Sequence, residues 1–538
     1  MGMGAYPSEV DVAIIGAGFA GLYSLHKLRD ELGLSARVIE TGSGPGGTWY
    51  WNRYPGARVD IPSMQYSYQF DDDLQQEWEW KEKYAPQAEI LEYVNHVVER
   101  FDLARDIQYD SRVVSSIYDD KAGKWTLTLE NGDELIARYC IMATGCLSAA
   151  NKPPFEGDDT FRGEVYHTGQ WPHDGVDFSG KAVGIIGTGS SAVQSIPVIA
   201  EQCRHLTVFQ RTPNFSAPAH NAPLDPEYAK AVKADYKAFR QRGQESLVAW
   251  DIEMNEKEYG EMSPGELKAC LEERWQMGGL FFYGTLADLL TNQAANDVVS
   301  EFVREKIRSK VDDAATADLL TPKTMIGCKR ICADTHYFET YNRDNVSLVD
   351  ISSTPISRIT PTGLEAGEQS WDFDVLVYAT GFDAMTGSLN RIDIRGRNGL
   401  RLKDKWEAGP RTMLGLQTAG FPNMFIIANA GSPSVLTNMI TAIEQHVEWI
   451  GDAIAHLKAS NLNTIEPTTA AEDEWVDHTN EVAGETLLLG CNSWYLGANI
   501  PGKARVFMPY LGYPDYKERC ETIAADGYPG FELSAAGA

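Results

Sequence analysis

The chain has 538 residues, which predicts several domains, and its 47 Lys and Arg against 76 Asp and Glu give a formal net charge of −29. A negative field of this size repels phosphate backbones and anionic lipid surfaces, which argues against nucleic acids and membranes as partners. Hydrophobic residues make up 43% of the chain and aromatic residues 10%, enough to bury sizeable cores. The composition therefore predicts a globular protein and excludes a disordered chain.

No targeting or membrane segment is expected. The chain begins MGMGAYPSEV, without the basic stretch and the apolar core of a signal peptide. It also has no run of about 18 consecutive apolar residues, the length that a membrane-spanning helix needs. We therefore expect a cytoplasmic protein.

The first βαβ unit is expected over residues 9–40, where an apolar strand, a glycine-rich turn, a helix pattern and a second strand follow one another. The turn contains Gly16, Gly18 and Gly21 in a GxGxxG pattern. These glycines allow a tight turn, a close approach of a pyrophosphate to backbone N–H groups, and tight packing of the helix on the strand. Glu40 ends the second strand, where a carboxylate accepts hydrogen bonds from both hydroxyls of a ribose. The unit therefore predicts a dinucleotide site.

A second unit of the same kind is expected over residues 181–211, and its turn contains Gly187, Thr188, Gly189, Ser190 and Ser191. Arg211 follows the first glycine of this turn by the same 24 residues that separate Glu40 from Gly16. A carboxylate at this point repels a 2′-phosphate, whereas a guanidinium binds one with two hydrogen bonds. The second site should therefore prefer NADPH to NADH, and we assign Thr212 to it as well.

The remaining segments indicate how the domains are arranged. Alternating strands are expected near residues 113–118 and 125–129, and Asn131-Gly132 is typical of a hairpin turn that closes them. A long amphipathic helix is expected from about Leu436 to Leu457. The expected parts are an FAD-binding domain over 1–145 and 379–538, an NADP-binding domain over 146–222 and 331–378, and a helical insertion over 223–330, with a mobile loop near the C-terminus.

Two dinucleotide sites of different specificity on one chain imply electron transfer between two cofactors. The carboxylate-type site fits FAD, and the internal site fits the nicotinamide donor, which leaves flavoprotein reductases and flavoprotein monooxygenases. A reductase of this kind needs a dithiol, and no CxxC pair is present. Monooxygenase is therefore favoured.

The cysteines give no sign of a disulfide framework or of a metal site. We expect them to be reduced thiols that mostly pack in the interior. The run from Cys328 to Cys332, followed by His336, lacks a fourth ligand, so we expect no metal. The eight positions are Cys140, Cys146, Cys203, Cys270, Cys328, Cys332, Cys491 and Cys520.

Residues 161–172, FRGEVYHTGQWP, match the pattern FxGxxxHxxxWP just before the second dinucleotide unit. In this pattern the chain resembles the type I Baeyer–Villiger monooxygenases, whose fingerprint it is. Residues 46–56, 379–383 and 492–502 agree with the same family, so the resemblance covers nearly the whole chain. The local sequence is most similar to steroid and phenylacetone monooxygenases, with cyclohexanone monooxygenase further off. The fingerprint residues are Phe161, Gly163, His167, Trp171 and Pro172.

The resemblance implies an α/β fold with two Rossmann-like dinucleotide-binding domains, for FAD and NADP, and a helical insertion in the NADP domain. It implies that NADPH reduces FAD, that O₂ adds to the flavin at C4a, and that the resulting peroxyflavin attacks a ketone to give an ester or lactone. Such an anion needs a permanent positive charge nearby, which an arginine supplies at any working pH. The family's catalytic arginine falls on Arg330, and Asp60 matches the acid that pairs with it and also faces the cofactors.

Further roles follow from the same resemblance. Lys329 matches a lysine that helps to bind the 2′-phosphate of NADPH, and Trp494 is expected to contact the NADP ribose when a C-terminal loop closes. His167 is expected to be a hydrogen-bonded hinge residue between the domains rather than a general acid or base. Gly47, Thr48 and Trp49 are assigned to cofactor binding, and Leu147, Leu436 and Met439 to the substrate pocket.

Two alternatives stay open. One is the oxidation of nitrogen or sulfur in amines and sulfides by a related flavin monooxygenase. The other is a non-catalytic NADPH-sensing protein that keeps the dinucleotide folds. The expected partners are a ketone and O₂, the expected state is a monomer or weak homodimer, and the sequence does not identify the ketone.

Overall fold

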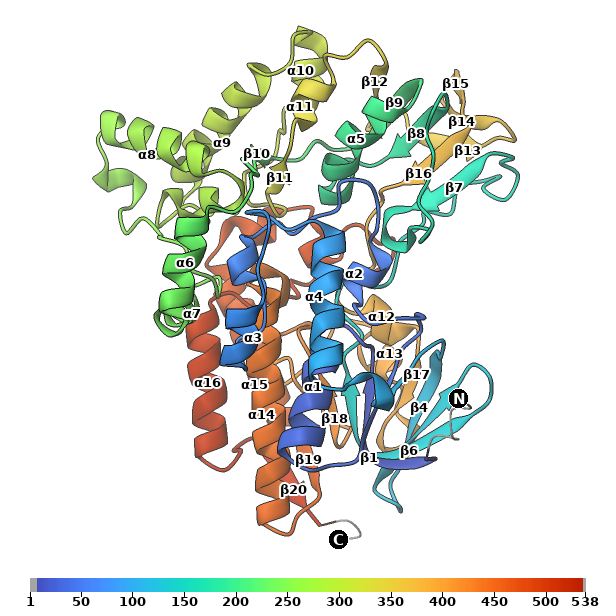
Figure 1. Ribbon diagram of the computed structural model, residues 1–538, viewed down its shortest axis with the longest axis vertical. Helices are drawn as coiled ribbons and strands as arrows, with labels where there is room; N and C mark the ends of the chain where they lie inside the picture. The colour runs from blue at the N-terminus through green and yellow to red at the C-terminus, as the bar shows by residue number, and fades with distance from the viewer. Residues whose placement is uncertain (1–6, 536–538) are drawn as a thin grey trace.

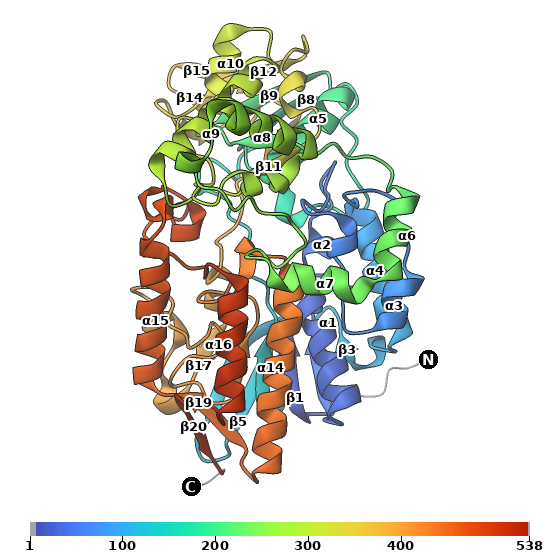
Figure 2. The same cartoon turned by 90° about the vertical axis from the view of Figure 1, so that its left-hand side faces the viewer.

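Two sheets of mainly parallel strands, each flanked by helices, organise the computed structural model, which describes residues 7–535. The sheets lie in two lobes that are stacked along the long axis of the molecule (Figure 1), and the view turned by 90° shows the same two lobes (Figure 2). This arrangement confirms the α/β class. Within the described residues, no helix has the length and apolar character needed to cross a membrane. Residues 1–6, on which the expectation of no targeting peptide partly rests, lie outside the described part.

The first sheet contains the expected N-terminal unit. Its order is β17-β4-β5-β6-β1-β2-β3, and β18 pairs with the end of β6. The first strand, β1, lies between β2 and β6 and is parallel to both. The strands are β1 (Glu9–Ile15), β2 (Ala36–Ile39), β3 (Ile107–Gln108), β4 (Val113–Asp119), β5 (Lys124–Leu129), β6 (Glu134–Met142), β17 (Asp393–Arg395) and β18 (Met424–Ile426). Segments from both ends of the chain therefore build one sheet.

The two expected alternating strands are present as β4 and β5, and a third antiparallel strand, β6, follows the Asn131-Gly132 turn. Strands β4, β5 and β6 pair antiparallel in sequence order. The Asn131-Gly132 turn joins β5 to β6, where Gly132 has a φ of +90° and donates its N–H to the Leu129 carbonyl. The turn therefore follows both expected alternating strands and leads from β5 into β6.

Long helices cover this sheet. They are α1 (Phe19–His26), α4 (Gln87–Arg100), α14 (Met439–Ala459), α15 (Thr469–Gly484) and α16 (Tyr513–Ala525). The expected helix from Leu436 begins three residues later, because residues 434–436 form a tight 3-10 turn and the Asn438 side chain caps α14 by accepting the N–H of Ile440. Short elements in the same lobe are α2 (Thr48–Trp51), α3 (Asp72–Glu77), α12 (Gly387–Asn390), α13 (Leu402–Lys405), β19 (Thr464–Pro467) and β20 (Phe531–Ser534).

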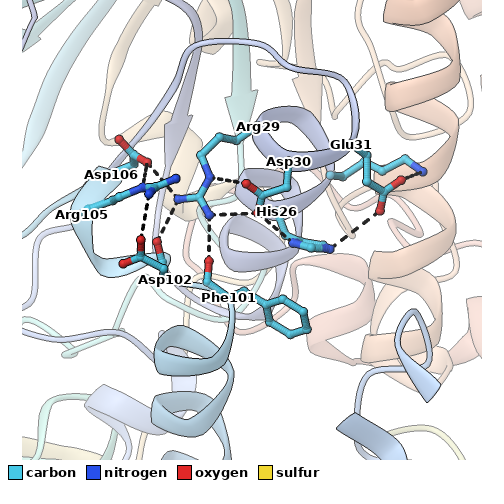
Figure 3. Close-up of polar contacts among 9 residues, drawn as sticks. His26, Arg29, Asp30, Glu31, Phe101, Asp102, Arg105 and Asp106 are labelled. Atoms are coloured by element: carbon cyan, nitrogen blue, oxygen red, sulfur yellow. Dashed lines mark hydrogen bonds and ion pairs between the residues drawn. The ribbon is translucent and has the colours of Figure 1, made fainter. Parts of the chain in front are cut away.

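Arg29 lies in the helical turn Lys27–Glu31 that continues α1, and its hydrogen bonds connect this turn to the end of α4 (Figure 3). Arg29 donates to the carbonyls of Phe101 and Asp102, at 2.8 and 3.0 Å, and to the Asp106 carboxylate at 2.9 Å. The last carbonyls of a helix lack partners within the helix and carry partial negative charge, so a guanidinium satisfies both needs. This contact holds α1, which follows the first glycine-rich turn, against the rest of its lobe.

The second sheet has five strands, all parallel, in the order β12-β9-β8-β16-β7. They are β7 (Glu164–His167), β8 (Ala182–Ile186), β9 (His205–Gln210), β12 (Val346–Asp350) and β16 (Val375–Tyr378), with helix α5 (Ser190–Gln202) after β8. Three antiparallel strands, β13 (Ile356–Ile359), β14 (Gly363–Ala366) and β15 (Gln369–Asp372), form a separate small sheet between β12 and β16 in the sequence.

The segment expected to be a helical insertion contains α6 (Pro226–Ala234), α7 (Tyr236–Glu245), α8 (Pro264–Met277), α9 (Gln293–Arg308) and α10 (Ala314–Leu320), and α11 (Tyr337–Thr340) follows it. Helices α6 and α7 are separated at Asp235, whose carboxylate caps α7 by accepting the N–H of Ala238. Strands β10 (Ser216–Pro218) and β11 (Cys332–Asp334) pair with each other, so the segment leaves and returns at one place. The exact domain boundaries stay a prediction.

A buried polar network ties this segment to the first lobe. Arg240 of α7 is only 6% exposed and donates to the Gln65 carbonyl, the Ser67 hydroxyl and the Gln75 side chain. Glu444 of α14 lies nearby and accepts the N–H groups of Gln69 and Phe70 through Oε1. Its other oxygen, Oε2, is buried without a hydrogen-bond partner among the described residues.

Burial raises the pKa of Glu444 from 4.5 to about 8, although the two N–H groups and the Arg240 charge act against the shift. Because the pKa of Glu444 is higher in the folded than in the unfolded protein, the stability that this group contributes is fully present below pH 4.5. That contribution is lost as the pH rises toward 8.

We expect Glu444→Gln to remove this loss, because the amide keeps an acceptor for the two N–H groups and never ionises. Its melting temperature should exceed that of the wild type at and above pH 8 and approach it in acid. Thermal unfolding followed against pH checks this. Glu474→Gln, which changes an exposed carboxylate on α15, is the matched control and should keep the wild-type profile. Equal pH profiles for the wild type and Glu444→Gln would contradict the expectation.

Candidate functional site

The first glycine-rich turn has the geometry of a pyrophosphate cradle. Gly16 has a φ of +106°, and a Cβ on Gly21 would lie 1.8 Å from the Gly16 carbonyl oxygen. Helix α1 begins directly after Gly18 without a side-chain cap, so its first N–H groups keep their capacity for an anion. The turn therefore needs its glycines for the backbone, and the helix end suits a phosphate group.

Glu40 lies where the sequence places it, at the end of β2. Its carboxylate is buried and accepts the N–H of Ala17 and of Gly42, both at 2.7 Å. Burial raises the pKa of Glu40, and these N–H groups act against the shift. Each carboxylate oxygen has a second lone pair, so the group can still accept hydrogen bonds from a ribose.

The segment with Gly47, Thr48 and Trp49 closes over this turn. Gly47 lies so near Gly18 that a Cβ on it would be 2.9 Å from the Gly18 Cα. Trp49 is buried and donates from its indole to the Tyr66 hydroxyl, whereas Thr48 is exposed. A ligand bound at the first turn is therefore bordered by this segment.

The second turn repeats the first. Gly187 has a φ of +116°, and a Cβ on it would lie 2.3 Å from the Ala379 carbonyl oxygen, whereas a Cβ on Gly189 would meet nothing within 4 Å. Helix α5 begins after Gly189 without a side-chain cap. This combination of open space and free helix N–H groups fits a dinucleotide.

Three neighbouring side chains stabilise the second turn rather than pointing freely into it. Thr188 donates to the Thr212 carbonyl at 2.9 Å. The Ser191 hydroxyl is 3.1 Å from that of Thr168, and the Ser190 hydroxyl is 3.4 Å from the Cys332 sulfur. The expected residues of this site are therefore brought together by hydrogen bonds.

Arg211 and Lys329 bring two positive charges to one place. Arg211 is exposed just after β9, and Lys329 is half-buried. Burial lowers the pKa of Lys329, and the neighbouring Arg211 charge lowers it further. Neither side chain forms an ion pair with any residue in the range 7–535. Two uncompensated cations suit a doubly charged anion such as a phosphate monoester.

Arg330 and Asp60 form the most constrained pair of the site. The Arg330 Nε and Nη2 atoms donate to the two Asp60 carboxylate oxygens at 2.6 and 3.0 Å. Nη1 donates to the Val435 carbonyl at 2.9 Å. Burial by itself lowers the pKa of Arg330, but the Asp60 carboxylate more than offsets this, so the pKa is raised. The guanidinium stays charged and has N–H groups left for another anion.

The sequence analysis missed the partners that surround this pair. They are the Val435 carbonyl, Tyr283, whose hydroxyl accepts the N–H of Ile331 at 3.2 Å, and Tyr495, which is 2% exposed and whose raised pKa the Arg330 charge acts to lower. Tyr283 lies 47 residues before Arg330 in the sequence, and Val435 and Tyr495 lie 105 and 165 residues after it. No local pattern could connect them.

The residues assigned to the substrate pocket are Leu147, Leu436 and Met439, and their side chains lie at one hydrophobic cluster. All three are partly buried and pack against one hydrophobic cluster, which we call the apolar cluster. Trp494 packs against it too, with its ring 4.3 Å from that of Tyr495. The buried members of the apolar cluster are Cys146, Ala384, Met385, Ala430, Val435, Ala483, Leu488, Tyr495, Leu496, Phe507 and Met508. Val435 and Tyr495 therefore connect this cluster to Arg330.

The fingerprint segment lies where the two lobes meet. His167 ends β7, accepts the N–H of Gly169 through Nδ1, and has Nε2 3.3 Å from the Asn151 carbonyl oxygen. Burial lowers the pKa of His167, which favours the neutral ring. Trp171 is buried and donates its backbone N–H to the Trp51 carbonyl in the first lobe. The fingerprint segment therefore contacts both lobes, as a hinge between the two domains would.

The other fingerprint residues have structural surroundings. A Cβ on Gly163 would lie 2.4 Å from the Asp374 carbonyl oxygen, so only glycine fits there. Phe161 packs on the hydrophobic core of the second sheet, and Pro172 is partly exposed after Trp171. These residues of the fingerprint therefore have packing roles in the structure.

The expectation of eight reduced thiols is wrong for two of them. Cys328 and Cys491 form a disulfide with a Cα–Cα distance of 5.5 Å, although 163 residues separate them. Tertiary packing brings their loops together, and spacing in the sequence carries no trace of it. The other six cysteines are free thiols. Among residues 7–535, no three His, Cys, Asp or Glu side chains are grouped so that they could hold a metal ion.

Comparisons with known proteins agree with this geometry. Residues 13–258 match the family model of pyridine nucleotide-disulphide oxidoreductases. A Baeyer-Villiger monooxygenase from Pseudooceanicola batsensis is 41% identical over 97% of this chain and 96% of its own. A phenazine N-monooxygenase from Lysobacter antibioticus is 40% identical over 98% and 97%. The solved structure of an oxidized steroid monooxygenase bound to NADP superposes with a TM-score of 0.93, at 51% identity, over 98% of this chain and 100% of that one.

The level of identity and the full-length coverage decide the classification. Both dinucleotide turns, the fingerprint and the arginine–aspartate pair lie within the aligned length. The chain belongs to the Baeyer–Villiger monooxygenases, flavoenzymes that use FAD and NADPH.

Proposed function

We propose that this chain inserts one oxygen atom beside the carbonyl of an uncharged ketone to give an ester or lactone, with NADPH and O₂ as co-substrates. The observation that carries the proposal is the Arg330–Asp60 pair next to the apolar cluster. A fixed positive charge beside an apolar surface suits a reaction in which negative oxygen forms near a nonpolar substrate. In this proposal the ketone binds against Leu147, Leu436 and Met439.

The flavin, when bound, supplies the electrons that activate O₂ after NADPH has reduced it. Gly16, Gly18 and Gly21 would hold its pyrophosphate, and Glu40 its ribose. The segment Gly47, Thr48 and Trp49 would close over it, because this segment packs on the first turn. The chain's own part in this step is therefore to bind and orient the cofactor.

The second turn would hold the nicotinamide dinucleotide. Helix α5 and the residues Gly187, Thr188, Gly189, Ser190 and Ser191 would cradle its pyrophosphate, as the open space at the helix end supports. Arg211 and Lys329 would bind the 2′-phosphate, with Thr212 fixing the turn beside them. Trp494 would contact the ribose.

Arg330 would stabilise negative oxygen with the N–H groups that Asp60 and Val435 leave free. Asp60 holds the plane of the guanidinium by two hydrogen bonds and keeps its charge in a buried place. Because an arginine does not give up its proton in proteins, it stabilises the anion without protonating it.

Oxidation of nitrogen or sulfur is the second candidate, because the phenazine N-monooxygenase is 40% identical over nearly the full length. The two candidates differ in product. A ketone and a thioether offered together, with products identified by mass spectrometry, separate them: ester as the main product supports the first, and sulfoxide alone supports the second. A purified protein that binds flavin but oxidises NADPH with neither product would exclude both. The cytoplasmic location and the monomeric or weakly dimeric state stay predictions.

Replacing Arg330 by Ala should leave flavin reduction by NADPH working and lower ester formation by at least about 100-fold, the effect of losing a preorganised charge at a developing anion. Rapid-mixing absorbance follows the reduction, and chromatography follows the ester. Arg330→Lys is the control, since it keeps a positive charge but cannot make both hydrogen bonds to Asp60. Normal ester formation by Arg330→Ala would refute the assigned role.

Replacing Arg211 by Ala should weaken NADPH binding by about 1–3 kcal/mol, the cost of losing a charge-assisted pair, with little change for NADH. Equilibrium binding of the two nucleotides to the oxidised protein measures this. Arg204→Ala provides a matched control, because Arg204 is an exposed arginine just before the same strand and lies 3.7 Å from Asp374. An equal loss for NADPH and NADH would show that Arg211 does not read the 2′-phosphate.

A further inference from the structure

The Cys328–Cys491 disulfide joins two loops that both belong to the candidate site. Cys328 directly precedes Lys329 and Arg330, and Cys491 lies three residues before Trp494. We call residues 325–331 the arginine loop and residues 491–508 the tryptophan segment. A covalent bond between them fixes how the proposed NADP contacts on the two sides lie relative to each other.

The tryptophan segment has polar contacts elsewhere, but none to the arginine loop. Lys503 donates to the Asp383 carboxylate and to the Ala384 carbonyl, both at 2.6 Å, and Asn499 donates to the Phe382 carbonyl at 2.7 Å. In the part of the chain that the structure describes, no hydrogen bond or ion pair joins residues 491–508 to residues 325–331. Apart from apolar packing, the disulfide is therefore what holds the segment on the arginine loop.

We propose that Cys328 and Cys491 form a redox-sensitive cross-link that clamps the tryptophan segment onto the arginine loop. In the oxidised protein the cross-link holds Trp494 against the dinucleotide site, and in the reduced protein the segment opens and closes more freely. The part of this inference that concerns NADP rests on the proposed function. The cross-link and the mobility that it controls do not.

The bond requires an oxidant, and hydrogen peroxide is the chemical class that suits it. A flavin monooxygenase that passes electrons from NADPH to O₂ without a substrate releases hydrogen peroxide. The half-buried Cys491 thiol attacks first, since Cys328 is only 4% exposed. An S–O bond forms, the O–O bond breaks and water leaves. Cys328 then attacks the Cys491 sulfur, the S–S bond forms, the S–O bond breaks and a second water leaves. Two thiols and one peroxide give one disulfide and two waters.

Thiol counting and peptide mapping test the cross-link itself. The peroxide-treated protein should show six reactive thiols in denaturant and the dithiothreitol-treated protein eight, and a non-reduced digest should contain the 328–491 linked peptide. Cys270→Ser changes a half-buried free thiol and should keep the linked peptide. Eight thiols after peroxide treatment, with no linked peptide, would overturn the proposal.

Limited proteolysis and NADP⁺ binding test what the cross-link does. Cleavage within residues 491–508 should be faster in the reduced wild type and in Cys491→Ser than in the oxidised wild type. The dissociation constant of NADP⁺ should rise about 3–10-fold on reduction, as expected if the segment is then closed for about 10–30% of the time. Cys491→Ser and Cys328→Ser should not respond to dithiothreitol, whereas Cys270→Ser should respond like the wild type.

Different results would contradict the clamp and the proposed dinucleotide site. Equal cleavage of the oxidised and reduced protein would overturn the clamp, whatever the nucleotide does. Faster cleavage on reduction, together with no NADP⁺ binding in either state, would keep the clamp and contradict the proposed dinucleotide site. Faster cleavage with an unchanged dissociation constant would overturn the link between the clamp and NADP.

Discussion

The ion pair between Arg330 and Asp60 is the constraint on which the rest of the site depends. A guanidinium can stay in a largely enclosed place only if its charge is paired and its donors are satisfied. Asp60 belongs to the first lobe, Arg330 lies two residues before β11 at the end of the helical segment, and Val435 lies in the 3-10 turn four residues before α14. The pair therefore forms only when these three parts of the chain are packed together.

The two dinucleotide turns show how one backbone arrangement is given two ligand preferences. Both turns place a glycine with a φ above +100° against the residue that follows a neighbouring parallel strand, and both lead into a helix without a side-chain cap. The difference lies one strand later, where the first unit has the buried Glu40 carboxylate and the second has Arg211, which Lys329 joins from the arginine loop. The charge at that point, rather than the fold, distinguishes the proposed ligands.

The contact between the first lobe and the helical segment contains buried polar groups. Arg240 reaches under residues 65–75 with three hydrogen bonds, and Glu444 stands beside it with one oxygen unsatisfied. Such groups stabilise one arrangement only, because any shift leaves a buried charge without its partners. Val435 of the apolar cluster, whose carbonyl accepts a hydrogen bond from Arg330, lies nine residues before Glu444, so the network also positions the site.

The sequence by itself determined the two βαβ units, because glycine patterns, apolar strands and the charge 24 residues later are all local. It also determined the helical character of the insertion, and by resemblance it placed Arg330 opposite Asp60. The tertiary structure was needed for the contacts between distant segments: Tyr283, Val435 and Tyr495 surround the guanidinium, and Cys328 meets Cys491. The physical reason is that contacts between residues from 47 to 165 positions apart arise from packing, which no pattern along the chain records.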